Sequence, residues 1–317
     1  MKLGLLTAAL AELPFEEMLD RVAALGLEAI ELHVALAAHC PAEALLKSKD
    51  RRKRWLAEIE RRGLIISSLS AHGNPLHPDP QTARRDNLRL RHAISLAQKL
   101  GVGRVNGFSG CPADPGGGSV PNWVTCPWPT EYAELVAWQW EAKAIPYWTR
   151  TARFAADRGV HIGLEMHPGF LVYNPETLLR LRSECGEAIG ANLDPSHLFW
   201  QGIDPLEAVR ALGPCIWHVH AKDCRLEPAN VRLNGVLDTK HYGQEARRAW
   251  VFRTVGYGHG ESFWRDFVSA LRVAGYDHVL SIEHEDSLMS VGEGIEKAAQ
   301  FLQPLLIRQP PTEMYWA

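Results

Sequence analysis

Four short apolar segments in the second half of the chain end in side chains that can bind a metal ion or carry a proton: Glu165, Asp194, His220 and Glu283. A buried carboxylate or imidazole without a partner is energetically costly, and a divalent cation removes that cost. Three carboxylates and one imidazole suit Mn²⁺, Mg²⁺, Co²⁺ or Zn²⁺ and leave positions for substrate oxygens. The pattern predicts one divalent ion, with Mn²⁺ preferred; a network of buried ion pairs is the alternative.

These segments belong to a longer alternation of apolar runs and amphipathic stretches. Parallel strands buried on both faces read as continuous apolar runs, and eight such runs are expected to be strands. They cover residues 3–7, 29–33, 65–70, 104–107, 161–166, 188–193, 216–221 and 279–283. The helical pattern covers residues 14–25, 42–62, 80–100, 131–158, 175–185, 204–212, 262–274 and 292–306.

The eightfold repeat of strand and helix predicts an α/β protein with a (β/α)8 TIM barrel, and an open doubly wound sheet is the alternative. We expect a single domain over residues 1–317, with a C-terminal tail at about 308–317. Two segments exceed what the barrel needs, residues 108–130 after strand four and 223–260 after strand seven. Both follow strands, so both should form lids or substrate walls at the mouth that holds the site in such barrels.

The composition and net charge limit the partners and the cellular location that we expect for this protein. Hydrophobic residues make up 46% of the 317 positions, and the net charge is −3 without a long basic run. Nucleic acid is therefore not an expected partner. No apolar run reaches the length of a membrane helix, and the apolar start of the chain is interpreted as the first strand instead of a leader. The six cysteines form no C-x-x-C pair, which favours reduced thiols in a cytoplasmic protein. Assembly into a homo-oligomer is left open.

The run Gly163-Leu164-Glu165-Met166-His167-Pro168 and the run His218-Val219-His220-Ala221-Lys222-Asp223 carry a family resemblance. The chain resembles the xylose-isomerase-like TIM barrel superfamily, which includes sugar phosphate isomerases and epimerases and the AP endonuclease family 2. The resemblance implies that Glu165, Asp194, His220 and Glu283 bind one metal ion. It also implies that Glu165 and Glu283 are the catalytic acid and base. The three-metal nuclease site looks incomplete, because strand four offers Val105-Asn106-Gly107 where a histidine ligand is expected.

The predicted chemistry is proton transfer next to a carbonyl group. A metal ion that binds a substrate carbonyl and its neighbouring hydroxyl acidifies the α-C–H, and a carboxylate then removes that proton to leave a metal-bound enediolate. The expected function is a sugar isomerase or epimerase acting on a small keto-hydroxy sugar or polyol. A lyase or deglycosidase of an oxidised (keto) glycoside would use the same site. A non-catalytic sugar-binding barrel is the third interpretation.

Further polar residues near the strand ends are expected to contact substrate: His72, His197, Lys222 and Arg253. Each has a structural alternative, such as a rim histidine with satisfied hydrogen bonds or, for Lys222, an ion pair with Asp223. We expect His218 to face outward, away from His220.

Overall fold

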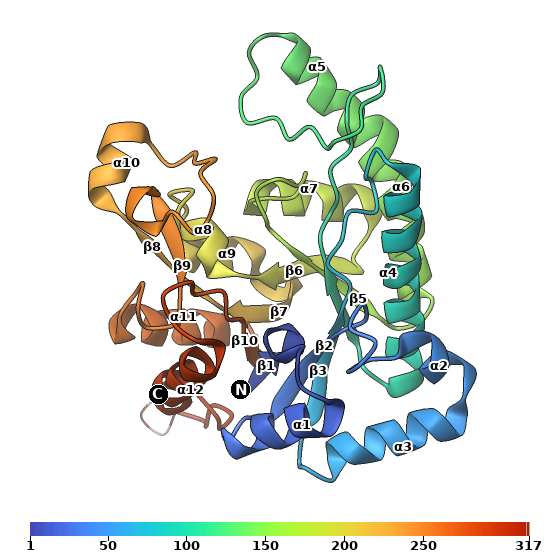
Figure 1. Ribbon diagram of the computed structural model, residues 1–317, viewed down its shortest axis with the longest axis vertical. Helices are drawn as coiled ribbons and strands as arrows, with labels where there is room; N and C mark the ends of the chain where they lie inside the picture. Colours follow the sequence, from blue (N-terminus) through green and yellow to red (C-terminus); the bar gives the residue numbers. More distant parts are fainter. Residues whose placement is uncertain (315, 317) are drawn as a thin grey trace.

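The centre of the computed structural model, which describes residues 1–314 and 316, is a closed ring of eight parallel strands (Figure 1). In ring order these strands are β1 (Lys2–Leu6), β10 (Val279–Ile282), β7 (Ile216–Ala221), β6 (Ile189–Leu193), β5 (His161–Glu165), β4 (Arg104–Gly107), β3 (Ile65–Ser70) and β2 (Ala29–His33). The predicted TIM barrel is confirmed. The first residues form β1, which pairs with both β10 and β2, so the apolar start of the chain is part of the barrel.

Helices surround the ring, and most of them bury apolar side chains against it. They are α1 (Phe15–Ala24), α2 (Ala42–Lys47), α3 (Lys49–Glu60), α4 (Pro80–Leu100), α5 (Glu131–Trp138), α6 (Ile145–Ala156), α7 (Pro175–Cys185), α8 (Pro195–Phe199), α9 (Pro205–Leu212), α10 (Pro228–Asn234), α11 (Glu261–Val273) and α12 (Val291–Leu302). None of these described helices is both long and apolar enough to cross a membrane. Residues 315 and 317 of the expected tail lie outside the described part of the chain.

Two stretches predicted as single helices are interrupted. Ser48 is extended and its side chain accepts a hydrogen bond from the amide of Arg51, so it caps α3 and separates it from α2. The stretch 131–158 contains a π-helical segment, Gln139–Ala144, between α5 and α6. Pro146 lies in the first turn of α6, and a proline has no amide hydrogen to donate to the preceding turn. The π-helical segment ends at Ala144, two residues before Pro146.

The long loop after β7 contains structure that the sequence did not predict. Strands β8 (Asp223–Leu226) and β9 (Trp250–Arg253) pair antiparallel in a small separate sheet, and α10 lies between them in the chain. Aromatic side chains of this segment pack around Trp200 to form a second, smaller apolar cluster. Figure 1 shows that α10, and α5 after the loop that follows β4, stand out from the ring of helices. Both long loops therefore rise from the carboxyl ends of strands, as predicted.

Candidate metal centre

The four predicted ligands come together at the carboxyl ends of neighbouring strands. Glu165 ends β5, Asp194 and Glu283 directly follow β6 and β10, and His220 is the last but one residue of β7. One ligand atom from each of the four lies within 4.8 Å of the others. Because β5, β6, β7 and β10 are consecutive in the ring, their ends bring these side chains to one side of the barrel mouth.

The donor set fits a divalent cation. Asp194 Oδ2 and Glu283 Oε2 are buried without a hydrogen-bond partner. Glu283 Oε2 lies 2.9 Å from His220 Nδ1, but this contact does not have the geometry of a hydrogen bond. Acceptor atoms that lie this close, without donors between them, are the arrangement that a shared cation stabilises. The structure thus contains a candidate metal site with three carboxylates and one imidazole.

The surroundings of the site shift the pKa values of the three carboxylates in different directions. Burial opposes ionisation of all three, but His197, His220 and His72 hold the pKa of Glu165 well below its usual range. Lys222 and His220 lower the pKa of Glu283 to about 2 in the same way. Burial raises the pKa of Asp194 to about 6, despite the nearby His197 and Lys222. Asp194 is therefore the carboxylate at which a proton competes with a cation near neutral pH.

Three of the four predicted substrate-binding residues surround this cluster. His72 Nε2 lies 3.2 Å from Glu165 Oε2, and His197 Nε2 lies 3.1 Å from Glu165 Oε1. Lys222 is buried, with its Nζ 3.7 Å from Glu283 Oε2 and 2.5 Å from Glu285 Oε2. Its partners are these carboxylates and not Asp223, the alternative considered from the sequence.

The fourth residue, Arg253, is bound elsewhere. It lies at the end of β9, and its Nε donates to Asp286 Oδ2 at 3.1 Å. The backbone amide of the next residue, Thr254, donates to the same oxygen at 2.8 Å. Arg253 thus fixes the long loop to the segment after β10, and the described structure shows no contact between its side chain and the four ligands.

The prediction that His218 faces outward is wrong. Side chains two residues apart on a strand share a face, so His218 and His220 both point into the barrel. His218 is fully buried, and its Nδ1 lies 3.1 Å from Asn192 Oδ1. Asn192 in turn donates to Glu165 Oε2 at 3.2 Å, so His218 belongs to the polar layer beneath the metal site.

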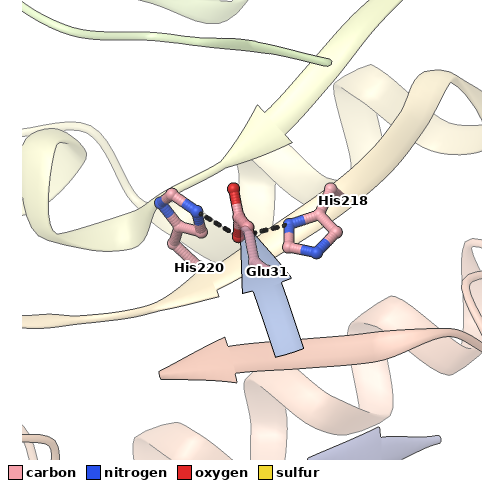
Figure 2. Close-up of side chains that lie close together, drawn as sticks. All are labelled: Glu31, His218 and His220. Carbon is pink, nitrogen blue, oxygen red and sulfur yellow. Dashed lines mark hydrogen bonds and ion pairs between the residues drawn. The ribbon is translucent and has the colours of Figure 1, made fainter. Parts of the chain in front are cut away.

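Glu31 also contacts the cluster and was not predicted from the sequence. This residue lies within β2, is fully buried, and accepts a hydrogen bond at Oε2 from His220 Nε2 at 2.9 Å (Figure 2). The available signal was a carboxylate inside an apolar strand, Ala29-Ile30-Glu31-Leu32. Glu31 does not lie at a strand end, which is the feature that distinguishes the predicted ligands, because it is two residues short of the end of β2.

The chain belongs to the xylose isomerase-like TIM barrel family, whose sequence model matches residues 19–305. It is 40% identical over 309 residues to YfiH of Bacillus subtilis (strain 168), an uncharacterized protein, which covers 96% of this chain and 98% of that protein. An inosose dehydratase of Geobacillus thermodenitrificans (strain NG80-2) is 29% identical over 157 residues, or 49% of this chain and 51% of that enzyme. The solved structure of the IOLI protein with a binding zinc atom has a TM-score of 0.65 at 19% identity, covering 96% of this chain and 98% of that one.

Proposed function

We propose that this protein is a divalent-metal-dependent isomerase or epimerase of a keto-hydroxy sugar or polyol, with Glu165 and Glu283 as its acid and base. The observation that carries the proposal is the buried cluster of four ligand atoms within 4.8 Å, in which two carboxylate oxygens have no hydrogen-bond partner. A D-tagatose 3-epimerase-like protein and a D-psicose 3-epimerase share the fold, and an inosose dehydratase is similar in sequence, which supports a sugar or polyol substrate.

The metal ion would be held by Glu165, Asp194, His220 and Glu283. Mn²⁺ is the preferred candidate because three oxygen ligands and one imidazole suit it, and the zinc atom of the IOLI structure makes Zn²⁺ the first alternative. When bound, such an ion acts as a Lewis acid that acidifies the C–H next to a carbonyl group.

We propose that the two glutamates act on different sides of a substrate. Strands β5 and β10 are separated in the ring by β6 and β7, so Glu165 and Glu283 are the two outer members of the cluster. The low pKa of each keeps both carboxylates ionised at neutral pH, which is the form that accepts a proton. His72 and His197 hold Glu165 in place, and Lys222 neutralises charge beside Glu283.

Elimination is the second candidate reaction. The similarity to an inosose dehydratase covers about half of this chain and favours it. The buried ammonium of Lys222, 3.7 Å from Glu283 Oε2, is a cation in the site that proton exchange alone does not require. In this reaction one of the two glutamates, Glu165 or Glu283, removes the α-proton. Lys222 then stabilises negative charge on the departing oxygen.

Solvent deuterium separates these reactions. Protein loaded with Mn²⁺ is incubated in D2O with free ketoses, inososes, keto-glycosides and sugar phosphates, and the products are followed by NMR. An isomerase or epimerase places deuterium on the α-carbon of a product with the same composition as the substrate. An eliminating enzyme releases water or an alcohol. If no substrate exchanges a proton or reacts, while sugars still bind, the catalytic proposal fails and a sugar-binding barrel remains.

A further inference from the structure

Glu31 is the most deeply placed carboxylate that contacts the metal centre without belonging to it. Its side chain rises from β2, across the barrel from the four ligands, and points between the rings of His218 and His220 (Figure 2). No solvent reaches it. Burying a charged group at this depth costs free energy, so the contacts of Glu31 should account for the presence of a carboxylate here.

The two nitrogens of His220 face different partners. Nε2 lies 2.9 Å from Glu31 Oε2, whereas Nδ1 points to the metal ligands, 2.9 Å from Glu283 Oε2 and 3.3 Å from Glu165 Oε2. An ionised carboxylate only accepts hydrogen bonds, so the imidazole nitrogen that faces Glu31 must carry the hydrogen. In the neutral imidazole this assignment leaves the lone pair of Nδ1 directed toward the other ligands, with Asn192 Nδ2 3.3 Å away.

We infer that Glu31 is the positioning residue of the metal centre: it fixes the tautomer and orientation of His220 so that Nδ1 is the ligand atom. The inference rests on the proposed function, because it needs an ion at the four-residue cluster. Carboxylates that hold the outer nitrogen of a histidine ligand raise its basicity and typically strengthen metal binding.

Glu31 is itself held from the opposite side. Asn106 on β4 donates from Nδ2 to Glu31 Oε1 at 2.8 Å and to Ser68 Oγ at 3.0 Å. Gly163 on β5 makes room for this asparagine, because a Cβ at that position would lie 2.6 Å from Asn106 Oδ1. The carboxylate therefore receives one donor on each oxygen, which determines the direction of both hydrogen bonds.

A second metal ion held by Glu31, His218 and His220 is the competing interpretation, since their ligand atoms also lie within 4.8 Å of one another. The contacts of His218 argue against it. Its Nδ1 is 3.1 Å from Asn192 Oδ1 and its Nε2 is 3.3 Å from Ser67 Oγ, so both nitrogens already have partners. Its Nδ1 is 3.7 Å from Glu31 Oε2, beyond hydrogen-bonding distance.

The substitution Glu31→Gln tests the role with almost no change in shape. If the amide oxygen faces His220, the amide NH2 meets the NH2 of Asn106. If it turns over, the NH2 meets His220 Nε2 and favours the wrong tautomer. The first orientation places two donors together and the second moves the hydrogen of His220 to Nδ1, so metal binding should weaken about 10- to 100-fold. Glu28→Gln is the matched control: this residue lies just before β2 and pairs with Lys2 and Arg308, away from the site.

The experiment measures Zn²⁺ binding to metal-free protein by titration calorimetry, together with circular dichroism to confirm folding. We expect one ion per chain in the native protein, weaker binding in Glu31→Gln, and native affinity in Glu28→Gln. Unchanged affinity in Glu31→Gln, with binding lost in Asp194→Ala, overturns the role of Glu31 and leaves the metal centre intact. Two ions in the native protein, one of them lost in Glu31→Gln, support the competing second site. Unchanged affinity in Asp194→Ala contradicts the metal centre itself.

A second measurement needs no variant and remains decisive if Glu31→Gln does not fold. In ¹⁵N-histidine-labelled native protein with Zn²⁺, NMR should show His220 with hydrogen on Nε2 and the metal on Nδ1. Hydrogen on Nδ1 with the metal on Nε2 would overturn the inference.

Discussion

The four proposed metal ligands differ in the groups that surround each of them. Glu165 and Glu283 contact imidazole and ammonium groups that keep them ionised, whereas Asp194 Oδ1 accepts the amide of Ser196 and caps α8. These surroundings suit the two glutamates to proton transfer and the aspartate to holding the ion and the local backbone.

This difference predicts distinct effects of three isosteric substitutions. Glu165→Gln and Glu283→Gln should each lower turnover by on the order of 10²–10⁴, because the base is lost. Asp194→Asn should act mainly through metal affinity, so excess Mn²⁺ should restore part of its activity and little of the other two. Steady-state kinetics over a range of Mn²⁺ concentrations measures this, with exposed Glu261→Gln as the control. Equal rescue of all three variants would mean that the glutamates only bind metal.

The raised pKa of Asp194 predicts how metal affinity depends on pH. Burial raises the pKa of Asp194 in the metal-free protein to about 6, so the ion must displace its proton below that pH and not above it. The pKa of His220, which burial lowers but Glu31 and Glu283 raise more strongly, lies well above its usual value. A proton on His220 therefore competes across the neutral range as well.

Affinity should consequently rise with pH, with about one more proton released per ion below pH 6 than above it. Calorimetry in buffers with different heats of ionisation counts these protons. The additional proton should be absent in Asp194→Asn. A proton count that does not change across pH 6 in the native protein would contradict the assignment to Asp194.

The sequence predicted the four ligands because each lies at or near the end of an apolar strand, where barrels expose side chains to the mouth. It could not predict Glu31 in the same way. The importance of Glu31 comes from His220, which lies 189 residues further along the chain. That pairing exists only once the ring has closed, because β1 and β10 lie between β2 and β7 in the ring.

At the scale of elements, aspartates fasten the long loop after β7. Asp223 Oδ2 accepts the backbone amides of Gly256, Gly258 and His259, and its Oδ1 lies 2.8 Å from His259 Nδ1. Gly258 is required at this contact, because a Cβ there would lie 2.4 Å from Asp223 Oδ1. These hydrogen bonds hold the turn after β9 against the start of β8. Asp223, the first residue of β8, directly follows Lys222 in the chain.

Asp223→Ala should release this turn. Three amides would lose their acceptor, and a partly buried donor without a partner costs about 1–3 kcal/mol. Hydrogen–deuterium exchange of residues 255–260 should become faster and the melting temperature should fall. Asp266→Ala, at an exposed position of α11, is the control. Unchanged exchange in Asp223→Ala would show that other contacts hold the loop.

Strand and helix positions were predictable because burial on both faces of a parallel strand leaves a plain apolar signal. The sheet of β8 and β9 was not, since its strands are four residues each and are separated by α10 and the residues around it. The breaks at Ser48 and before Pro146 depend on one capping side chain and one missing amide, which a pattern of hydrophobic spacing does not detect.

At the scale of the whole molecule, the metal site joins four strands that are consecutive in the ring but distant in sequence. An ion at this point would tie β5, β6, β7 and β10 together and relieve the repulsion among three carboxylates. Metal binding should therefore stabilise the entire barrel and not one loop.

The melting temperature should rise by several degrees with saturating Mn²⁺ and fall on chelation. A ligand at 100 times its Kd stabilises a folded protein by about 2.7 kcal/mol. Differential scanning calorimetry measures the shift, and Asp194→Ala should show little of it. The same shift in Asp194→Ala and in native protein would place the stabilising ion elsewhere.

Anomalous diffraction can show directly whether one divalent ion binds among Glu165, Asp194, His220 and Glu283. Crystals soaked in Mn²⁺ are measured on both sides of the manganese absorption edge. We expect one strong peak per chain, about 2.0–2.4 Å from a carboxylate oxygen of each acidic ligand and from His220 Nδ1. A peak between Glu31 and His218, or a cluster of four without a peak in crystals that bind Mn²⁺ elsewhere, would contradict it.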